Sequence, residues 1–328
     1  MTQAQRAAIE LAAANHNPID ADLALAVLEA DQADLPPIYA AARALKQRVF
    51  GQTVHLCSVL NARSGHCPED CRFCAQSAHF QTAAPTYKLL GREEIHAGLD
   101  SAAELPIARF GLVTSGRALA PALVDQLAEA IGTHRAEGVG WCASLGMLDE
   151  TQLTKLASAG MTRFHHNLET AESFFPQICS THTYQERIET LRAAKRAGLS
   201  RCCGGILGMG ESLAQRVELA LAISAEEIES ITLNFLIAIP GTPLADQPPM
   251  SADEILRATA MFRLTNPAAE IRICGGRMLL GERQAEIYEV GGSGMMMGKL
   301  LTTSGQDVAA DLQMLADLEL VSERHSLA

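Results

Sequence analysis

The chain has 328 residues, of which 48% are hydrophobic, and it carries a formal net charge of −12 at pH 7. The hydrophobic content is ample for a large core, and the negative charge argues against nucleic acid or an anionic membrane as a partner. No apolar run approaches the roughly 18 residues of a membrane span, and the N-terminus lacks a signal-peptide pattern. We therefore expect a cytoplasmic protein whose nine cysteines are reduced thiols or metal ligands rather than disulfides.

The first 50 residues are predicted to form a helical extension that begins with an amphipathic helix. From there, short strand-like runs alternate with longer helical ones. The predicted strands are residues 53–60, 107–115, 138–145, 161–168, 199–207, 230–239, 269–276 and 292–299. Between them, segments such as 122–138 and 183–198 have apolar residues at helical spacing and end in glycine.

Eight strands that alternate with helices predict the α/β fold class and a parallel (β/α)8 barrel of the TIM type. A doubly wound open sheet is the alternative, but the strand count and the even composition favour the barrel. We expect a helical extension (1–50), a barrel (51–315) and a C-terminal tail (316–328). Because functional groups of such barrels follow the C-terminal ends of strands, the loop at 61–80 should lie at the active mouth.

Three cysteines lie in that loop, in the segment SGHCPEDCRFCAQS: Cys67, Cys71 and Cys74. A zinc ribbon would need a second cysteine pair about 12–20 residues later, but residues 75–141 contain no cysteine. Three thiolates can instead hold three irons of a [4Fe–4S] cluster and leave the fourth iron open to another ligand. His66 in the loop is predicted to be solvated, and Cys179, alone in FFPQICSTHTY, is interpreted as structural.

With Phe73 just before the last cysteine, the loop resembles that of the radical S-adenosylmethionine (SAM) superfamily, whose unique iron chelates SAM. The segment GGILGMGE is similar to the superfamily's adenine-site motif, at Gly204, Ile206, Gly208 and Glu211. Its glycines would let the backbone approach a planar ring closely. An ordinary glycine-rich turn is the alternative for that segment taken alone. By the same resemblance, Ser115, Gly116 and Arg117 would meet the SAM ammonium.

A closer resemblance, over about residues 50–315, is to the biotin synthase family. It is carried by CPEDCRFCAQS, HHNLET (165–170), TYQERIETLRAAKRAG, GGILGMGES, NFLIAIPGTPLAD (234–246), IRICGGR (271–277) and KLLTT (299–303). The resemblance implies a radical SAM sulfurtransferase that converts dethiobiotin to biotin, the final step of biotin biosynthesis. Sulfur would be inserted between two unactivated carbons by way of a 5′-deoxyadenosyl radical.

The same resemblance implies the cofactors and partners. These are a [4Fe–4S] cluster, SAM and an auxiliary iron–sulfur cluster, [2Fe–2S] in the family, as the sulfur donor. A reducing flavodoxin- or ferredoxin-type donor and a homodimer are also expected from the family.

Residue roles follow from the matched motifs. Asn167 and Glu169 would bind the ribose hydroxyls of SAM, and both should face one side of a strand because Leu168 separates them. A strand-end cap is the alternative for Asn167. Asn234 matches a position that contacts the substrate near its ureido ring, where an amide can both donate and accept hydrogen bonds. Of His165 and His166, one must face away from the barrel interior.

The family's auxiliary cluster is held by three cysteines and an arginine. The matching positions here are Gly111, Cys142, Cys202 and Arg272, and the last of these would also lie near the substrate. Gly111 has no side chain and cannot bind iron, so this chain departs from the family pattern at that position.

Strand alternation ranks the thiols that could replace the missing ligand. Cys274, two residues from Arg272 and on the same face, is the first candidate. Cys57, on the first strand with unknown facing, is the second, whereas Cys203 should face away from Cys202. We hypothesise a rearranged auxiliary cluster of open nuclearity on Cys142, Cys202 and Cys274, with Arg272 nearby.

Two alternatives remain. Other enzymes of the biotin-synthase-like group share the fold: hydrogenase maturases, a methylornithine-forming mutase and lipoyl-forming enzymes. A non-catalytic iron–sulfur carrier would not need the ribose and adenine motifs, so cleavage of SAM by the reduced protein would discriminate against it.

Overall fold

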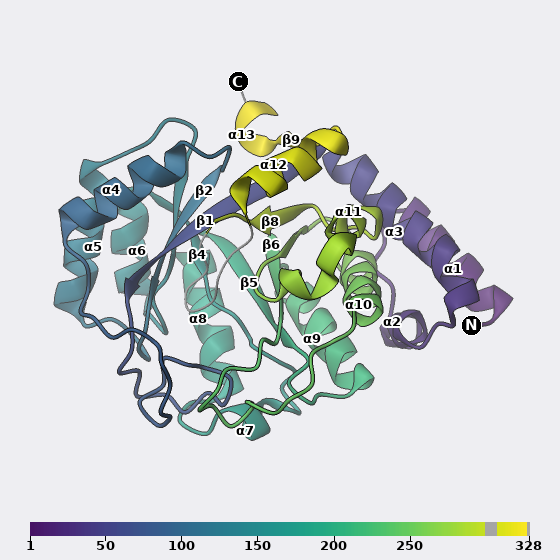
Figure 1. Cartoon of the computed structure of the whole chain (residues 1–328), viewed down its shortest axis with the longest axis horizontal. Coiled ribbons are helices and arrows are strands. Elements are labelled where there is room, and N and C mark those ends of the chain that lie inside the picture. Colours follow the sequence, from purple (N-terminus) through teal and green to yellow (C-terminus); the bar gives the residue numbers. More distant parts are fainter. Residues whose placement is uncertain (299–306, 327–328) are drawn as a thin grey trace.

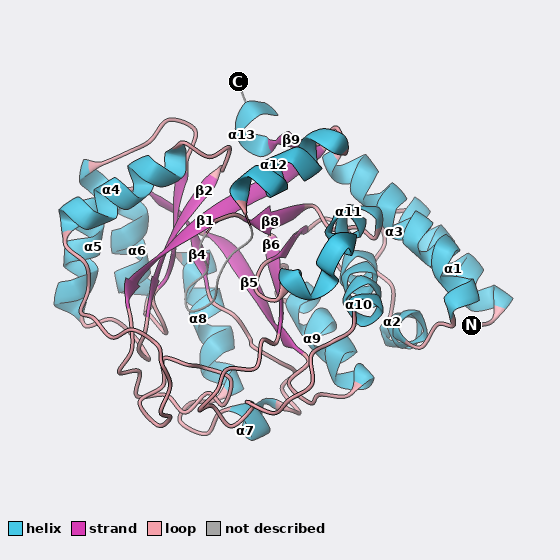
Figure 2. Cartoon of the chain, in the orientation of Figure 1, coloured by secondary structure: helices cyan, strands magenta, loops and turns pink. Residues whose placement is uncertain are grey.

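The structure is a computed structural model that describes residues 1–298 and 307–326. Eight strands form its barrel: β1 (Thr53–Arg63), β2 (Arg109–Thr114), β3 (Gly140–Ser144), β4 (Met161–His165), β5 (Ser200–Leu207), β6 (Ser230–Phe235), β7 (Glu270–Ile273) and β8 (Gly294–Met296). Each strand pairs in parallel with the next, and β1 pairs with both β2 and β8. This closure confirms the (β/α)8 barrel and excludes the open sheet (Figure 2).

All eight predicted strands are present, but several are shorter than predicted. The run at 161–168 ends as a strand at His165, and the run at 230–239 ends at Phe235. The apolar residues beyond these ends continue into loops at the barrel mouth, so hydrophobicity alone overstates the strand lengths. Part of the predicted strand 292–299 and the segment KLLTT lie outside the described residues.

Helices surround the strands (Figure 2). Between consecutive strands lie α4 (Arg92–Ala103), α5 (Pro121–Thr133), α6 (Glu150–Ala159), α7 (Phe175–Ile178), α8 (Tyr184–Arg196), α9 (Leu213–Ala225), α10 (Ala252–Thr265), the 3₁₀ segment η2 (Arg277–Ala285) and α11 (Glu286–Glu289). Capping boxes at Asp149, Thr183, Ser212 and Ser251 define where α6, α8, α9 and α10 begin. Gly198 follows α8 with a φ of +76°, as the predicted C-terminal glycine requires. Among the described residues, none of the helices combines the length and the apolar character needed to cross a membrane.

Both ends of the described chain pack against the barrel (Figure 1). Helices α1 (Gln3–Ala14), α2 (Ala21–Leu28) and α3 (Leu35–Phe50), with the short η1 (Gln32–Asp34), precede β1, and α2 and α3 pack on α10. At the other end come α12 (Val308–Asp317), β9 (Val321–Ser322) and α13 (Glu323–Ser326), and β9 pairs with the start of β1. The expected boundary at residue 315 falls inside α12, and the three-part division stays a prediction.

Strand alternation sorts the barrel residues into two faces. Cys203 is fully buried in the apolar core on the outer face of β5. Its neighbour Cys202 lines the barrel interior, as predicted. Arg272 and Cys274 both line the interior, and Cys57, whose facing the sequence left open, lines it too. The interior therefore gathers several thiols and a guanidinium below the mouth.

Candidate active site

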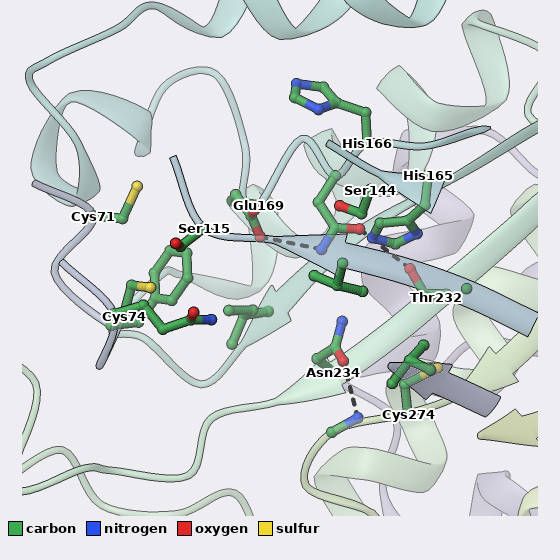
Figure 3. A pocket seen from close by; sticks show the side chains of 18 of the residues that line it. Cys71, Cys74, Ser115, Ser144, His165, His166, Glu169, Thr232, Asn234 and Cys274 are labelled. Atoms are coloured by element: carbon green, nitrogen blue, oxygen red, sulfur yellow. Dashed lines mark hydrogen bonds between the residues drawn. The ribbon is translucent and has the colours of Figure 1, made fainter. Parts of the chain in front are cut away.

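A cavity of about 410 Å³ runs from the loops at the barrel mouth into the barrel interior. The residues predicted from sequence that line it are Cys67, Cys71, Phe73, Cys74, Gly111, Ser115, Gly116, Arg117, Cys142, Asn167, Glu169, Cys202, Ile206, Asn234, Arg272 and Cys274. Figure 3 shows residues from both levels of this cavity, with Cys71 and Cys74 on one side and Asn234 and Cys274 on another. The cysteine loop and the interior thiols thus open into one space.

Hydrogen bonds within the cysteine loop fix its shape. The Cys67 N–H donates to the carbonyl of Gln76 over 3.0 Å, and the Cys67 carbonyl accepts from the N–H of Ala78 over 2.8 Å. The Cys74 N–H donates to the Cys71 carbonyl over 2.9 Å, which makes a tight turn between those two cysteines. Three thiols on this closed loop are a donor set that suits an iron–sulfur cluster. His66 is exposed, as predicted.

Ser115 and Arg117 are held by protein partners at the mouth. The Ser115 hydroxyl donates to the carbonyl of Gly65 over 2.7 Å, which links the end of β2 to the cysteine loop. The Arg117 guanidinium pairs with Glu186 and donates to the carbonyl of Thr181 over 2.9 Å. Arg117 therefore contributes to the wall of the cavity with its charge already compensated.

The side chains of Asn167 and Glu169 meet just beyond the end of β4. Strand β4 itself ends at His165, but pairing with β5 continues to Glu169, whose carbonyl accepts from the N–H of Ile206 over 2.8 Å and whose φ is +68°. The Asn167 amide donates to the Glu169 carboxylate over 3.3 Å, and Arg187 donates to the Asn167 carbonyl over 2.9 Å. Thr232 donates its hydroxyl to the Asn167 side chain over 3.2 Å. This network places a carboxylate and an amide at the cavity wall.

The side chains of the two adjacent histidines point in different directions, although both residues line the cavity. Nδ1 of His165 lies 3.2 Å from the sulfur of Cys202, inside the barrel. His166 stacks on Phe164, which belongs to the apolar core, and in Figure 3 its ring points away from the other labelled side chains. Burial lowers the pKa of His166 well below its usual range, so this ring is a neutral packing group.

The glycine motif at 204–211 is only partly at the cavity. Ile206 lines it, but Gly204 and Gly208 do not. A Cβ at Gly204 would lie 1.8 Å from the carbonyl oxygen of Thr232, so the glycine is needed for close contact between β5 and β6. Glu211 is buried, and its carboxylate accepts from the N–H groups of Gly208 and Met209 over 2.8 Å each. The glycines and Glu211 therefore shape the turn beside Ile206.

Four cysteines and Arg272 line the inner part of the cavity: Cys57, Cys142, Cys202 and Cys274 are the thiols. Arg272 donates to the sulfur of Cys202 over 3.3 Å. Burial opposes the charged thiolate, but Arg272 and His165 outweigh it and lower the pKa of Cys202 to about 6. Burial and the neighbouring Cys202 raise the pKa of Cys142 to about 12. The interior thus combines one activated thiolate with thiols that an iron centre would have to deprotonate.

The Asn234 amide is oriented by the backbone (Figure 3). Its oxygen accepts from the Gly275 N–H over 2.9 Å, and its nitrogen donates to the Gly205 carbonyl over 3.2 Å. One N–H and one lone pair remain for another molecule in the cavity.

Cys179 and His182 lie beside Cys71, a contact that the sequence did not reveal. Cys179 was interpreted as a structural thiol, but its sulfur lies 3.8 Å from that of Cys71 and 3.2 Å from Nδ1 of His182. The sequence could not reveal this contact, because 108 residues separate the two cysteines. The C-x2-H spacing of Cys179 and His182 was the available signal.

The fold and the cysteine loop define a radical SAM enzyme. A family model for the radical SAM superfamily matches residues 62–223, and one for the biotin and thiamin synthesis associated domain matches residues 232–321. Biotin synthase from Maridesulfovibrio salexigens is 51% identical over 303 residues, which are 92% of this chain and 93% of that protein. Biotin synthase from Trichlorobacter lovleyi is 44% identical over 312 residues, which are 94% of each. The chain belongs to the biotin synthase family.

Solved structures agree on the fold. Methylornithine synthase superposes with a TM-score of 0.84 at 16% identity, covering 97% of this chain and 98% of that one. HydG, a maturase of the [FeFe]-hydrogenase, also has a TM-score of 0.84 at 16% identity, covering 99% and 76%. Family membership makes this chain an enzyme that uses a [4Fe–4S] cluster and SAM.

Proposed function

We propose that this chain is the sulfurtransferase that converts dethiobiotin to biotin. The observation that carries the proposal is that one cavity joins the cysteine loop, the ribose-type pair Asn167 and Glu169, and the interior thiols. Sulfur insertion into dethiobiotin needs SAM, the substrate and a sulfur source together in one enclosed space. The identity to biotin synthases along nearly the whole chain supports the same reaction.

Cys67, Cys71 and Cys74 would hold the [4Fe–4S] cluster. When bound, the reduced cluster supplies the electron that starts radical chemistry on SAM. The chain's own part is to position SAM: Phe73 and Ile206 offer apolar walls, and the backbone edge at Ser115 and Gly116 lies beside the cysteine loop.

Asn167 and Glu169 would bind the ribose of SAM. Their oxygens are acceptors, and Arg187, which also lines the cavity, holds both residues in place, so hydroxyl groups of a ligand can donate to them. Asn234 would orient the ureido ring of dethiobiotin with its remaining N–H and lone pair. Both assignments use groups that hydrogen bonds within the protein already orient.

A rearranged auxiliary cluster would lie on Cys142, Cys202 and Cys274, with Arg272 beside it. The thiols fit iron, and Arg272 offsets the negative charge of sulfur ligands in a buried space. The side chain of Cys57 could serve as a fourth ligand of this cluster, since Cys57 lines the same part of the cavity. With Gly111 unable to bind iron, these thiols would also hold the donated sulfur near the substrate.

The remaining parts of the proposal rest on the family, for the electron donor and the homodimer, and on the sequence pattern, for the location and the division of the chain. They are a flavodoxin- or ferredoxin-type electron donor, a homodimer, a cytoplasmic location and the division into residues 1–50, 51–315 and 316–328.

Anaerobic incubation of the cluster-loaded protein with dethiobiotin, SAM and a reductant tests the proposal. We expect biotin and 5′-deoxyadenosine, both identified by mass. Formation of 5′-deoxyadenosine without biotin would reject dethiobiotin as the substrate and keep the superfamily. No cleavage of SAM with intact clusters would favour an iron–sulfur carrier.

A further inference from the structure

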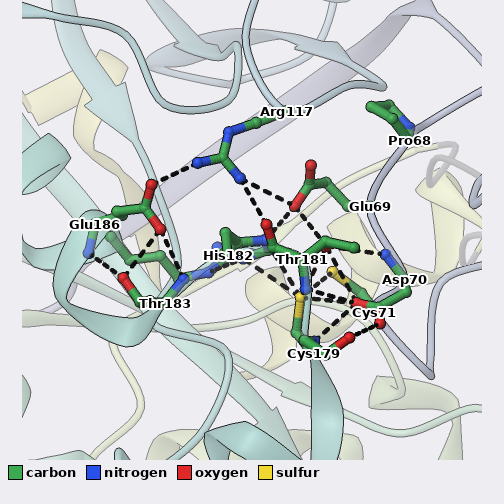
Figure 4. Close-up of polar contacts among 12 residues, drawn as sticks. Pro68, Glu69, Asp70, Cys71, Arg117, Cys179, Thr181, His182, Thr183 and Glu186 are labelled. Atoms are coloured by element: carbon green, nitrogen blue, oxygen red, sulfur yellow. Dashed lines mark hydrogen bonds and ion pairs between the residues drawn. The ribbon is translucent and has the colours of Figure 1, made fainter.

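The thiols of Cys71 and Cys179 meet at the edge of the cavity. They are 3.8 Å apart and both side chains are buried. Cys179 has no role in the proposed sulfur insertion, and it does not line the cavity. Figure 4 shows its sulfur at the centre of a set of polar contacts that includes Cys71, Thr181 and His182.

Hydrogen bonds on both sides of the two cysteines hold their segments together. The Arg72 N–H donates to the carbonyl of Ile178 over 3.0 Å. The Asp70 carboxylate accepts from the N–H groups of Ser180 and Thr181, over 2.9 Å and 3.2 Å. The residues before and after Cys71 are thus tied to the residues around Cys179. These hydrogen bonds keep the two segments that carry Cys71 and Cys179 side by side.

A metal ion is a poor occupant for this group, although His182 adds a third donor atom. Nε of Arg187 donates to Nε2 of His182 over 3.0 Å. Because a guanidinium cannot accept, Nε2 must be the acceptor and Nδ1 must carry the ring proton. That proton faces the carboxylate of Glu69 and the sulfur of Cys179. A protonated Nδ1 has no lone pair for a metal, so His182 acts as a hydrogen-bond donor.

We propose that Cys71 and Cys179 form a disulfide when the chain lacks its [4Fe–4S] cluster and meets molecular oxygen. Two S–H bonds break and one S–S bond forms. The two electrons and two protons pass to O2, which becomes H2O2. The sulfurs must approach from 3.8 Å to about 2.05 Å to form the bond.

The disulfide would protect the cluster site. A free Cys71 thiol exposed to oxidant proceeds to sulfinic and sulfonic acids, which thiol reductants do not reverse, whereas a disulfide returns to two thiols on reduction. The bond would also keep Cys71 from binding iron until a reductant opens it. The protective effect rests on the proposed role of Cys71 as a cluster ligand. Formation of the disulfide does not, and it needs neither SAM nor dethiobiotin.

Peptide mapping of the wild-type chain tests the linkage directly. Cluster-free protein, prepared with a chelator under reducing conditions, is exposed to air, alkylated and digested. We expect a linked pair of peptides containing Cys71 and Cys179 as the main oxidised product, lost on treatment with dithiothreitol and lacking in cluster-loaded protein. A main product that joins Cys67 to Cys74, or Cys71 recovered chiefly as free thiol or sulfinic acid, would overturn the proposal.

A variant pair tests the protective effect. Cys179→Ala and the matched control Cys203→Ala, a core thiol on the outer face of β5, are exposed to air without cluster and then reduced. Iron uptake at the [4Fe–4S] site, measured by absorbance and iron content, should recover in wild type and control. It should be at least about twofold lower in Cys179→Ala, with Cys71 found as sulfinic acid. Equal recovery in the three proteins would refute protection, whatever the result with dethiobiotin.

Discussion

Gly111 and Cys142 are register partners on the neighbouring strands β2 and β3, and both line the inner cavity. A Cβ at Gly111 would lie 3.2 Å from Cγ1 of Val59 and 3.7 Å from the carbonyl oxygen of Ser58. A Cβ there therefore needs only a small adjustment of Val59. The family's ligand is missing from a position that has almost enough room for it.

The first prediction is that Gly111→Cys changes the auxiliary cluster. A thiol at this position would adjoin Cys142 and compete with Cys274 for iron, so the Mössbauer spectrum of the reconstituted protein should differ from that of wild type. Gly111→Ala is the control, because it adds the Cβ without a thiol. The same spectrum for both variants would show that a thiol at position 111 does not reach the cluster.

The second prediction concerns the interior thiols themselves. Cys274→Ser should lose or alter the auxiliary signals, since a hydroxyl is a poor iron ligand, while the [4Fe–4S] signals on the loop persist. Cys57→Ser should change the auxiliary-cluster signals less than Cys274→Ser does, because Cys57 is the second candidate for the replacement ligand. Cys203→Ala, on the opposite face of β5, serves as the control. Identical auxiliary-cluster signals in wild type and Cys274→Ser would exclude Cys274 as a ligand.

Much of the fold and the inner cavity could be predicted because strand alternation is a local property. The period of two correctly separated Cys202 from Cys203 and put Cys274 beside Arg272. Asn167 and Glu169 show the limit of that argument. Strand β4 ends at His165, yet hydrogen bonds to β5 continue as far as Glu169, whose positive φ ends the extended segment.

Contacts between distant segments could not be predicted in this way. The contact of Cys71 with Cys179 depends on how the loop after β1 folds over the segment after α7. The need for glycine at position 204 comes from the backbone of β6, which only the register of the strands reveals.

The third prediction is that Glu169→Gln weakens SAM binding. The change removes the charge that strengthens a hydrogen bond to a ribose hydroxyl, and charge-assisted bonds of this kind contribute about 1.5–3 kcal/mol. We expect the KM for SAM to rise about tenfold, because an amide oxygen still accepts but more weakly. Glu169→Asp, which keeps the charge, is the comparison and should stay closer to wild type. Equal KM values for SAM in wild type and Glu169→Gln would remove Glu169 from the ribose site.

The fourth prediction is a pH dependence of stability at the start of α10. The Glu254 carboxylate accepts from the N–H and the hydroxyl of Ser251, over 2.9 Å each. Burial opposes the charge on Glu254, but the bonds from Ser251 outweigh it and lower its pKa. The charged form therefore stabilises the fold above the unfolded-state pKa of about 4.3, and this contribution disappears as the pH falls through the folded-state value.

Urea unfolding of wild type and Glu254→Gln measures this effect. The difference in unfolding free energy between the two proteins should be largest near neutral pH and shrink below about pH 4. Asp149 caps α6 in the same way but with Gln152 as its partner, so Gln152→Ala provides a capping change without a titrating side chain. A difference for Glu254→Gln that grows as the pH falls would reverse the assigned sign.

The last prediction is that Asn234→Ala weakens the binding of dethiobiotin and not of SAM. The side chain is held by Gly205 and Gly275, which leaves one donor and one acceptor directed at the inner cavity. Loss of two hydrogen bonds to a cyclic urea, at about 1 kcal/mol each, should raise the KM for dethiobiotin at least tenfold. The KM for SAM and the iron content should stay near wild type, since the cysteine loop does not contact Asn234. A rise in the KM for SAM with an unchanged KM for dethiobiotin would move Asn234 out of the substrate site and into the SAM site.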